Sequence, residues 1–192
     1  MRDLNDPKVR SLNLHYLRLM EKINLLSTSS ISFTTTEFAL LSEAILKAGR
    51  SIRFRAPGIS MQPLIQDGDQ LVVAPVETER IRLGDILLFI SEGGRALVHR
   101  VIKRQKPDGF LCFVMQGDHV SHPDWCVTPS MILGKVTLIE RNGEIIRTDG
   151  ILMKILGKAA CWHSLRKPGS TKLATGIFHL ARHLPGINKY LT

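Results

Sequence analysis

Ser60 and His99 are the residues of this sequence whose types and settings best fit nucleophilic catalysis. Ser60 lies in a short segment bounded by Gly58 and Pro63, and His99 follows 39 positions later in a strand-like run. A serine hydroxyl keeps its proton at neutral pH, so it needs a base before it can attack a carbonyl. An imidazole, which titrates near pH ~6.5, is suited to remove that proton. The pair predicts the chemistry of a serine peptidase.

The neighbours of Ser60 favour a fixed and unusual backbone path. Gly58 tolerates conformations closed to other residues, and Pro63 restricts the chain on the other side. A serine held in such a turn can stand exposed, with backbone N–H groups near a developing oxyanion. We therefore count Gly58 and Met61 as supporting residues. The alternative is that Ser60 only caps the turn, which is a common use of serine.

His99 lies in an alternating apolar run from Leu97 to Ile102. A strand would hold the imidazole rigidly and direct it to one face, as a general base requires. The alternative is a half-buried histidine whose ring bonds a backbone carbonyl.

Asp118 and Asp124, in the segment 117–124, could each supply the carboxylate that orients the imidazole and stabilises its charged form. Gly-Asp and Pro-Asp pairs are also ordinary turn sequences, so a purely structural role stays open for both.

A zinc site is the other chemistry that this region could hold. His119 and His122, with Cys112 and Cys126, are suitable ligand types, but their spacing fits no standard zinc module. We expect neither a metal nor a cofactor. With Cys161 the cysteines number three and include no Cys-x-x-Cys, which favours reduced thiols in a cytoplasmic compartment.

The sequence divides into three zones. Residues 1–50 read as a helical N-terminal extension, with a helix that starts at Thr35 or Thr36 as N-cap and stops at Gly49. Residues 51–148 consist of short β-type runs separated by Gly-containing turns, without intervening helices, which predicts a mainly β domain. Residues 149–192 return to helical patterning as a basic C-terminal extension. The candidate strands are Ile52–Ala56, Gln70–Ala74, Asp85–Ile90, Ala96–Lys103, Phe110–Gln116, Ile132–Glu140 and Glu144–Arg147.

Charge is concentrated at the C-terminus. The net charge is +9, and residues 151–192 contain seven Lys or Arg and no Asp or Glu. Basic helices with aromatic residues can lie on an anionic membrane, whereas the aromatics are too sparse to favour nucleic acid. The alternative is that these helices pack on the β domain and leave a solvated basic face. No apolar stretch approaches the ~20 residues of a transmembrane helix, and no signal peptide is evident. We expect a protein in the cytoplasm or peripheral to the inner face of the membrane.

Five blocks occur in the order found in a known superfamily. The blocks are Gly58–Asp69, Gly84–Phe89, Leu97–Ile102, Gly117–Asp124 and Ile132–Val136. Together they resemble the type I signal peptidases and the SOS-repressor autoproteases, over roughly residues 52–140. The resemblance implies a coiled β-sheet peptidase fold with a peptide-binding groove.

The base at position 99 sets the predicted subgroup. Bacterial signal peptidases and SOS repressors use lysine there, whereas His99 resembles the archaeal, endoplasmic-reticulum and sporulation-type enzymes. That resemblance implies a catalytic set of Ser60, His99 and Asp124, with Asp118 in support and a peptide or protein as substrate. The alternatives are a self-cleaving SOS-repressor-like regulator and a non-catalytic module that docks on membrane or nucleic acid through its basic tail.

Overall fold

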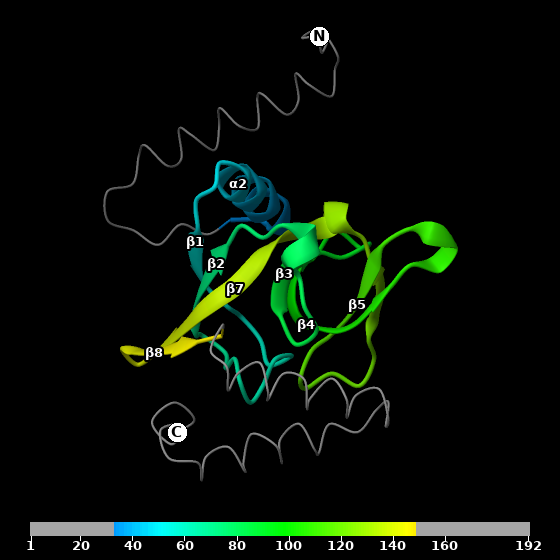
Figure 1. Ribbon diagram of the computed structural model, residues 1–192. Coiled ribbons are helices and arrows are strands. Elements are labelled where there is room, and N and C mark those ends of the chain that lie inside the picture. Colours follow the sequence, from blue (N-terminus) through cyan, green and yellow to red (C-terminus); the bar gives the residue numbers. More distant parts are fainter. Residues whose placement is uncertain (1–32, 149–192) are drawn as a thin grey trace, which may run out of the picture.

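The computed structural model describes residues 33–148 (Figure 1). The predicted helices before Phe33 and the basic extension 149–192 lie outside the described residues. One α-helix, α2, precedes the strands. The elements are α2 Thr35–Lys47, β1 Ile52–Arg55, β2 Gln70–Ala74, β3 Ile86–Ile90, β4 Ala96–Gln105, β5 Cys112–Gln116, β6 Asp124–Val127, β7 Ile132–Arg141 and β8 Glu144–Arg147, with 3-10 turns at Thr78–Arg80, Pro107–Gly109 and Pro129–Met131.

Helix α2 begins at a capping box. The Thr34 side chain accepts a hydrogen bond from the Glu37 N–H, and the Glu37 carboxylate accepts one from the Thr34 N–H. The N-cap is therefore Thr34, one residue before the earlier of the two predicted positions. Leu46 is buried against the sheet, and the Phe38 ring meets that of Phe54 edge-on at 4.9 Å. The helix thus packs against the sheet at β1, β4 and β7.

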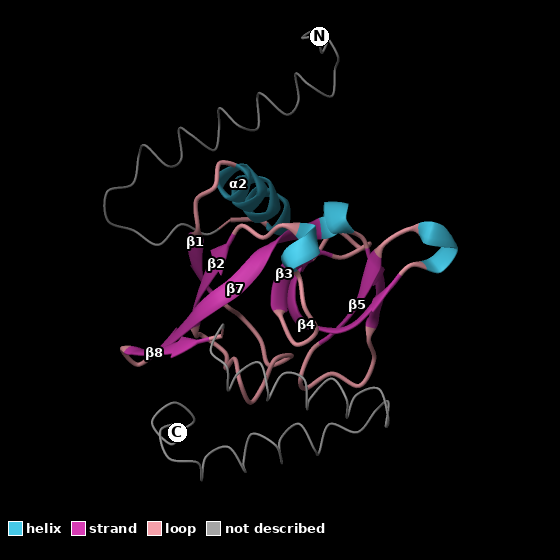
Figure 2. Cartoon of the chain, viewed as in Figure 1, coloured by secondary structure: helices cyan, strands magenta, loops and turns pink. Residues whose placement is uncertain are grey.

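The strands form one antiparallel sheet in the order β1-β2-β7-β3-β4-β5-β6, with β8 paired to β7. Figure 2 shows that this sheet curls into a half-barrel, with β3, β4 and β5 curving round one side. The predicted mainly β fold is confirmed.

The apolar interior has two main parts. One lies beneath α2 and includes Met61, Leu71 and Ile139, and the other, around Phe89 and Phe113, fills the curl of β3, β4 and β5. In the described part of the chain, no helix is both long and apolar enough to cross a membrane.

All seven predicted strands are present, and β6 is an additional strand that the sequence did not predict. It is only four residues long, follows Pro123, and starts at Asp124. It pairs with β5 through Phe113↔Val127 and Met115↔Asp124.

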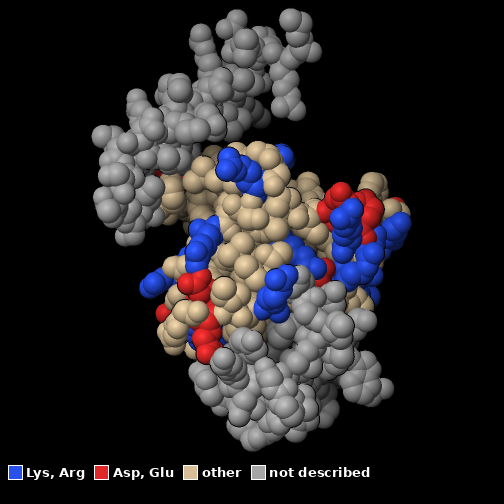
Figure 3. Space-filling view, turned by 60° about the vertical axis from the view of Figure 1, so that its left-hand side comes forward, with Lys and Arg blue, Asp and Glu red and all other residues tan. Residues whose placement is uncertain are grey.

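Surface charge on the described residues is mixed. Figure 3 shows separate groups of Lys and Arg side chains on the face in view, several of them beside acidic side chains. This face therefore presents no continuous basic field.

Candidate active site

The turn that carries Ser60 follows β1 and is pinned at both ends. Gly58 has φ +95°, a conformation that favours glycine, and its N–H donates to Asp67 Oδ1 at 2.6 Å. Met61, next to the serine, is only 3% exposed and packs in the core beneath α2. Ser60 itself is half-buried, beside the exposed Ile59. The fixed backbone path expected from the sequence is present.

A buried ion pair ties the end of this turn to β7. Arg141 donates from Nε to Asp69 Oδ1 at 2.9 Å and from Nη2 to Asp69 Oδ2 at 2.7 Å. The same Nη2 also donates to the Leu64 carbonyl at 2.9 Å. Since Leu64 lies four positions after Ser60, the guanidinium fixes the serine turn to the central part of the sheet.

His99 lies in β4, opposite Leu87 of β3, and its side chain is 7% exposed. Its Nδ1 is 2.5 Å from Asp124 Oδ2, at the first residue of β6. The Asp124 side chain is 30% exposed, so the pair lies at the boundary between core and solvent. A carboxylate on Nδ1 favours the tautomer in which Nδ1 is protonated and Nε2 is free to accept a proton.

Gly117 marks where the serine turn meets His99. A Cβ placed on Gly117 would lie 2.5 Å from the Ser60 carbonyl oxygen and 3.0 Å from His99 Nε2. The His119 N–H donates to that same Ser60 carbonyl at 2.8 Å. His99 Nε2 and the Ser60 carbonyl oxygen therefore both lie close to the place that a Cβ at position 117 would take. Only glycine fits there.

Sequence reasoning did not single out Gly117 as a site residue. It did place this glycine in a Gly-Asp pair directly after a predicted strand. The missing information was register, because Arg100 pairs with Gln116 and this sets Gly117 opposite His99.

The backbone N–H of Ser60 donates no hydrogen bond to any described residue. A free backbone N–H next to a serine hydroxyl is the kind of donor that an oxyanion hole requires.

Asp118 pairs with Arg100, not with His99. Arg100 donates from Nε to Asp118 Oδ1 at 2.7 Å and from Nη2 to Oδ2 at 2.5 Å, and the two side chains are 2% and 3% exposed. Its Nη1 donates to the Gly84 carbonyl at 2.9 Å. Arg100 follows His99 in β4, so this buried pair joins the strand that carries the imidazole to the loop after β5.

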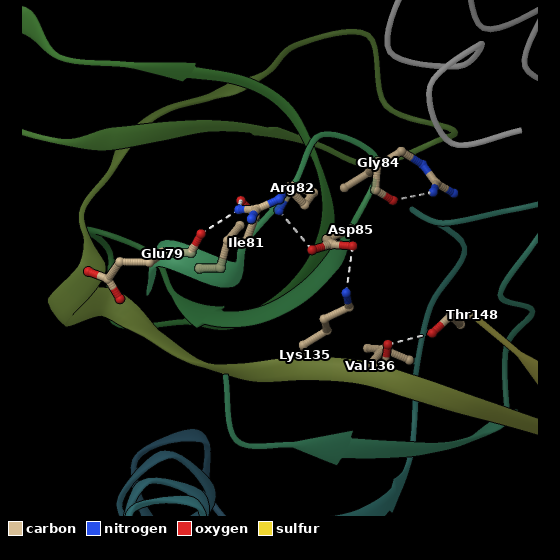
Figure 4. Close-up of polar contacts among 9 residues, drawn as sticks. Glu79, Ile81, Arg82, Gly84, Asp85, Lys135, Val136 and Thr148 are labelled. Atoms are coloured by element: carbon tan, nitrogen blue, oxygen red, sulfur yellow. Dashed lines mark hydrogen bonds and ion pairs between the residues drawn. The ribbon is translucent and has the colours of Figure 1, made fainter. Parts of the chain in front are cut away.

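A third ion pair, between Lys135 and Asp85, fixes the beginning of β3. Asp85 accepts from Lys135 Nζ of β7 at 2.7 Å and from the Arg82 N–H at 2.9 Å (Figure 4). The Asp85 carbonyl accepts from the Val101 N–H at 2.8 Å, which links the same corner to β4. Figure 4 also shows the Gly84 carbonyl directed toward a guanidinium, the contact made by Arg100.

The two remaining histidine candidates, His119 and His122, are exposed. His119 meets the serine turn through its backbone N–H. Within residues 33–148 no group of three or more His, Cys, Asp or Glu side chains is placed to hold a metal ion.

The curled antiparallel sheet brings a half-buried serine, an imidazole and a carboxylate into one region. These are residue types suited to hydrolytic chemistry. A family model described as Peptidase S24-like matches residues 26–137, more than half of the chain. The chain belongs to this Peptidase S24-like family. Membership confirms the broader part of the predicted resemblance, and the match includes α2 and the strands from β1 into the first part of β7.

Proposed function

We propose that this protein is a serine endopeptidase that uses Ser60 as nucleophile, His99 as base and Asp124 as the residue that orients the base. The observation that supports it most is the placing of the two imidazole nitrogens. Nδ1 contacts Asp124 at 2.5 Å, while Nε2 faces the position at Gly117 where Ser60 also approaches.

The proposed reaction begins when Ser60 Oγ attacks the scissile carbonyl and His99 Nε2 takes the hydroxyl proton. The backbone N–H of Ser60 stabilises the oxyanion. His99 then gives its proton to the leaving amine, and an acyl-enzyme forms on Ser60. Water, activated by the same imidazole, releases the acyl group. The proposed reaction needs no cofactor.

The substrate we propose is an extended peptide with small side chains beside the cleaved bond, as in the histidine-base signal peptidases that the sequence resembles. Among the described strands β1 pairs only with β2, so its other edge has unpaired backbone groups directly before the serine turn. An extended peptide can add to such an edge by main-chain hydrogen bonds.

Cleavage of the protein's own chain is a second candidate, which membership in the Peptidase S24-like family favours. Self-cleavage within one molecule would proceed at a rate independent of protein concentration. Intact mass spectrometry across a tenfold concentration range therefore separates the two candidates.

The proposed activity can be tested by digestion of a peptide library with the full-length protein. We expect new peptide termini with the wild type and with Ser130→Ala, a control at an exposed serine. Ser60→Ala and His99→Ala should each abolish cleavage, because groups that act as a unit lose nearly everything when one is removed. Equal cleavage by wild type and Ser60→Ala would overturn the proposal.

A further inference from the structure

Two cysteines lie side by side on neighbouring strands, although they are 14 positions apart in the sequence. The Sγ atoms of Cys112, in β5, and Cys126, in β6, are 2.9 Å apart, and both thiols are free. A disulfide holds its sulfurs at about 2.05 Å, so small side-chain rotations would close the remaining gap. The pairing Phe113↔Val127 sets the two cysteines diagonally opposite across the strand pair.

The two thiols differ in access to solvent. Cys126 is exposed, whereas Cys112 is 1% exposed. A reagent in solution can therefore reach Cys126, while Cys112 is placed to react only with its neighbour. This is the division of roles between an attacking and a resolving cysteine.

The chain between them carries much of the candidate active site. It includes Gly117, which meets Ser60 and His99, and Asp124, which contacts His99. A covalent bond between the two cysteines would close this segment into a loop and restrict its opening.

We propose that Cys112 and Cys126 form a reversible disulfide that closes the segment carrying Gly117 and Asp124, with a low-molecular-weight disulfide as the oxidant. The Cys126 thiolate attacks one sulfur of the oxidant, which releases one small thiol and leaves a mixed disulfide. Cys112 loses its proton, attacks Cys126 Sγ and displaces the second small thiol. The two protein thiols lose two electrons, and the oxidant is reduced to two thiols.

The surroundings of Cys126 disfavour its thiolate. The pKa of the Cys126 thiol is raised, chiefly by the hydrogen bond with Cys112. Burial and the nearby charges of Cys112 and Glu92 add to this increase. Only the thiolate attacks, so oxidation should be slow at neutral pH and faster in mildly alkaline solution.

The test uses full-length protein carrying Cys161→Ser, which removes the third cysteine. After treatment with oxidised glutathione at mildly alkaline pH, we expect both remaining thiols to be lost to thiol reagents and the intact mass to fall by two hydrogen atoms. A non-reduced digest should contain the peptide linked through Cys112 and Cys126, and dithiothreitol should reverse the change. Amides that exchange only through unfolding should exchange on the order of 100-fold more slowly in the oxidised form.

The Cys112→Ser control in the same background should stop at a stable glutathione adduct on Cys126. A persistent adduct in the protein that retains both cysteines would overturn the proposal, as would disulfide-linked dimers in place of the internal bond. These readouts do not depend on peptidase activity, so they stand or fall separately from the proposed function.

Discussion

The two aspartates near the site should fail in different ways when each is changed to asparagine. Asp118 faces Arg100 through two hydrogen bonds, and both side chains are almost fully buried. Asp124 faces His99 and keeps 30% of its side chain exposed. We therefore expect Asp118 to contribute mainly to stability and, in the proposed mechanism, Asp124 to the reaction.

The size of each effect follows from these surroundings. Asp118→Asn removes the charge that accepts two hydrogen bonds from the buried Arg100 guanidinium, which costs about 3–5 kcal/mol. For a chain of this length each kcal/mol lowers Tm by roughly 2–4 °C, so we expect a fall on the order of 10 °C. Asp124→Asn removes a pair at the solvent boundary and should cost no more than about 1 kcal/mol. Its rate should fall about 10²–10⁴-fold, because asparagine favours the wrong imidazole tautomer.

Thermal unfolding followed by circular dichroism, with acylation by a serine-directed probe well below each Tm, measures both effects. Asp108→Asn is the control, since Asp108 is exposed at the β4–β5 turn with φ 48°, which asparagine tolerates. A larger rate loss for Asp118→Asn than for Asp124→Asn, at a temperature where both are folded, would refute the assignment.

Three further predictions concern the glycine contact, the base and the tail. Gly117→Ala should lower the acylation rate at least tenfold, because the added Cβ would lie 2.5 Å from the Ser60 carbonyl oxygen. Gly93→Ala, whose Cβ would have no atom nearer than 4.0 Å, should match the wild type. Equal rates for the two variants would contradict the contact. The rate should rise with pH, since a general base must be uncharged to take the serine proton, and a rate that falls as the pH rises would contradict the proposed base. Full-length protein should sediment with anionic vesicles at low salt, because each Lys or Arg near the membrane surface contributes about 1 kcal/mol of binding energy. A chain ending at Gly150 should not sediment. Failure of both proteins to sediment would exclude attachment through residues 151–192.

The strands were predictable because their apolar residues alternate and glycine turns separate them. The exception, β6, is short and follows Pro123, and its first residue, Asp124, is typical of a turn. Its pairing with β5 depends on long-range contacts that no local pattern encodes. Helix α2 was predicted as an element, but its packing was not. The burial of Leu46 in the core beneath the helix depends on tertiary contacts.

For the site, residue types and order indicated Ser60, His99 and two candidate carboxylates, of which the family resemblance favoured Asp124. Which carboxylate faces the imidazole is set by the curl of the sheet, which brings Asp124 from β6 to β4. The pairing of Asp118 with Arg100 could not be predicted from the sequence either. An arginine in a strand is normally expected to face solvent, whereas Arg100 is buried because both faces of β4 are covered. The cysteine pair was missed for the same reason, since it joins two strands of which only one was predicted.

The measurement that tests the catalytic role of Ser60 most directly is the site of covalent labelling by a serine-directed acylating probe. Intact mass spectrometry of the full-length protein should show one adduct, and peptide mapping should place it on Ser60. Ser60→Ala should remain unlabelled, His99→Ala should label at least 100-fold more slowly, and Ser130→Ala should label like the wild type. Labelling of Ser60→Ala at the wild-type rate, or an adduct that maps to another residue, would contradict the proposed nucleophile.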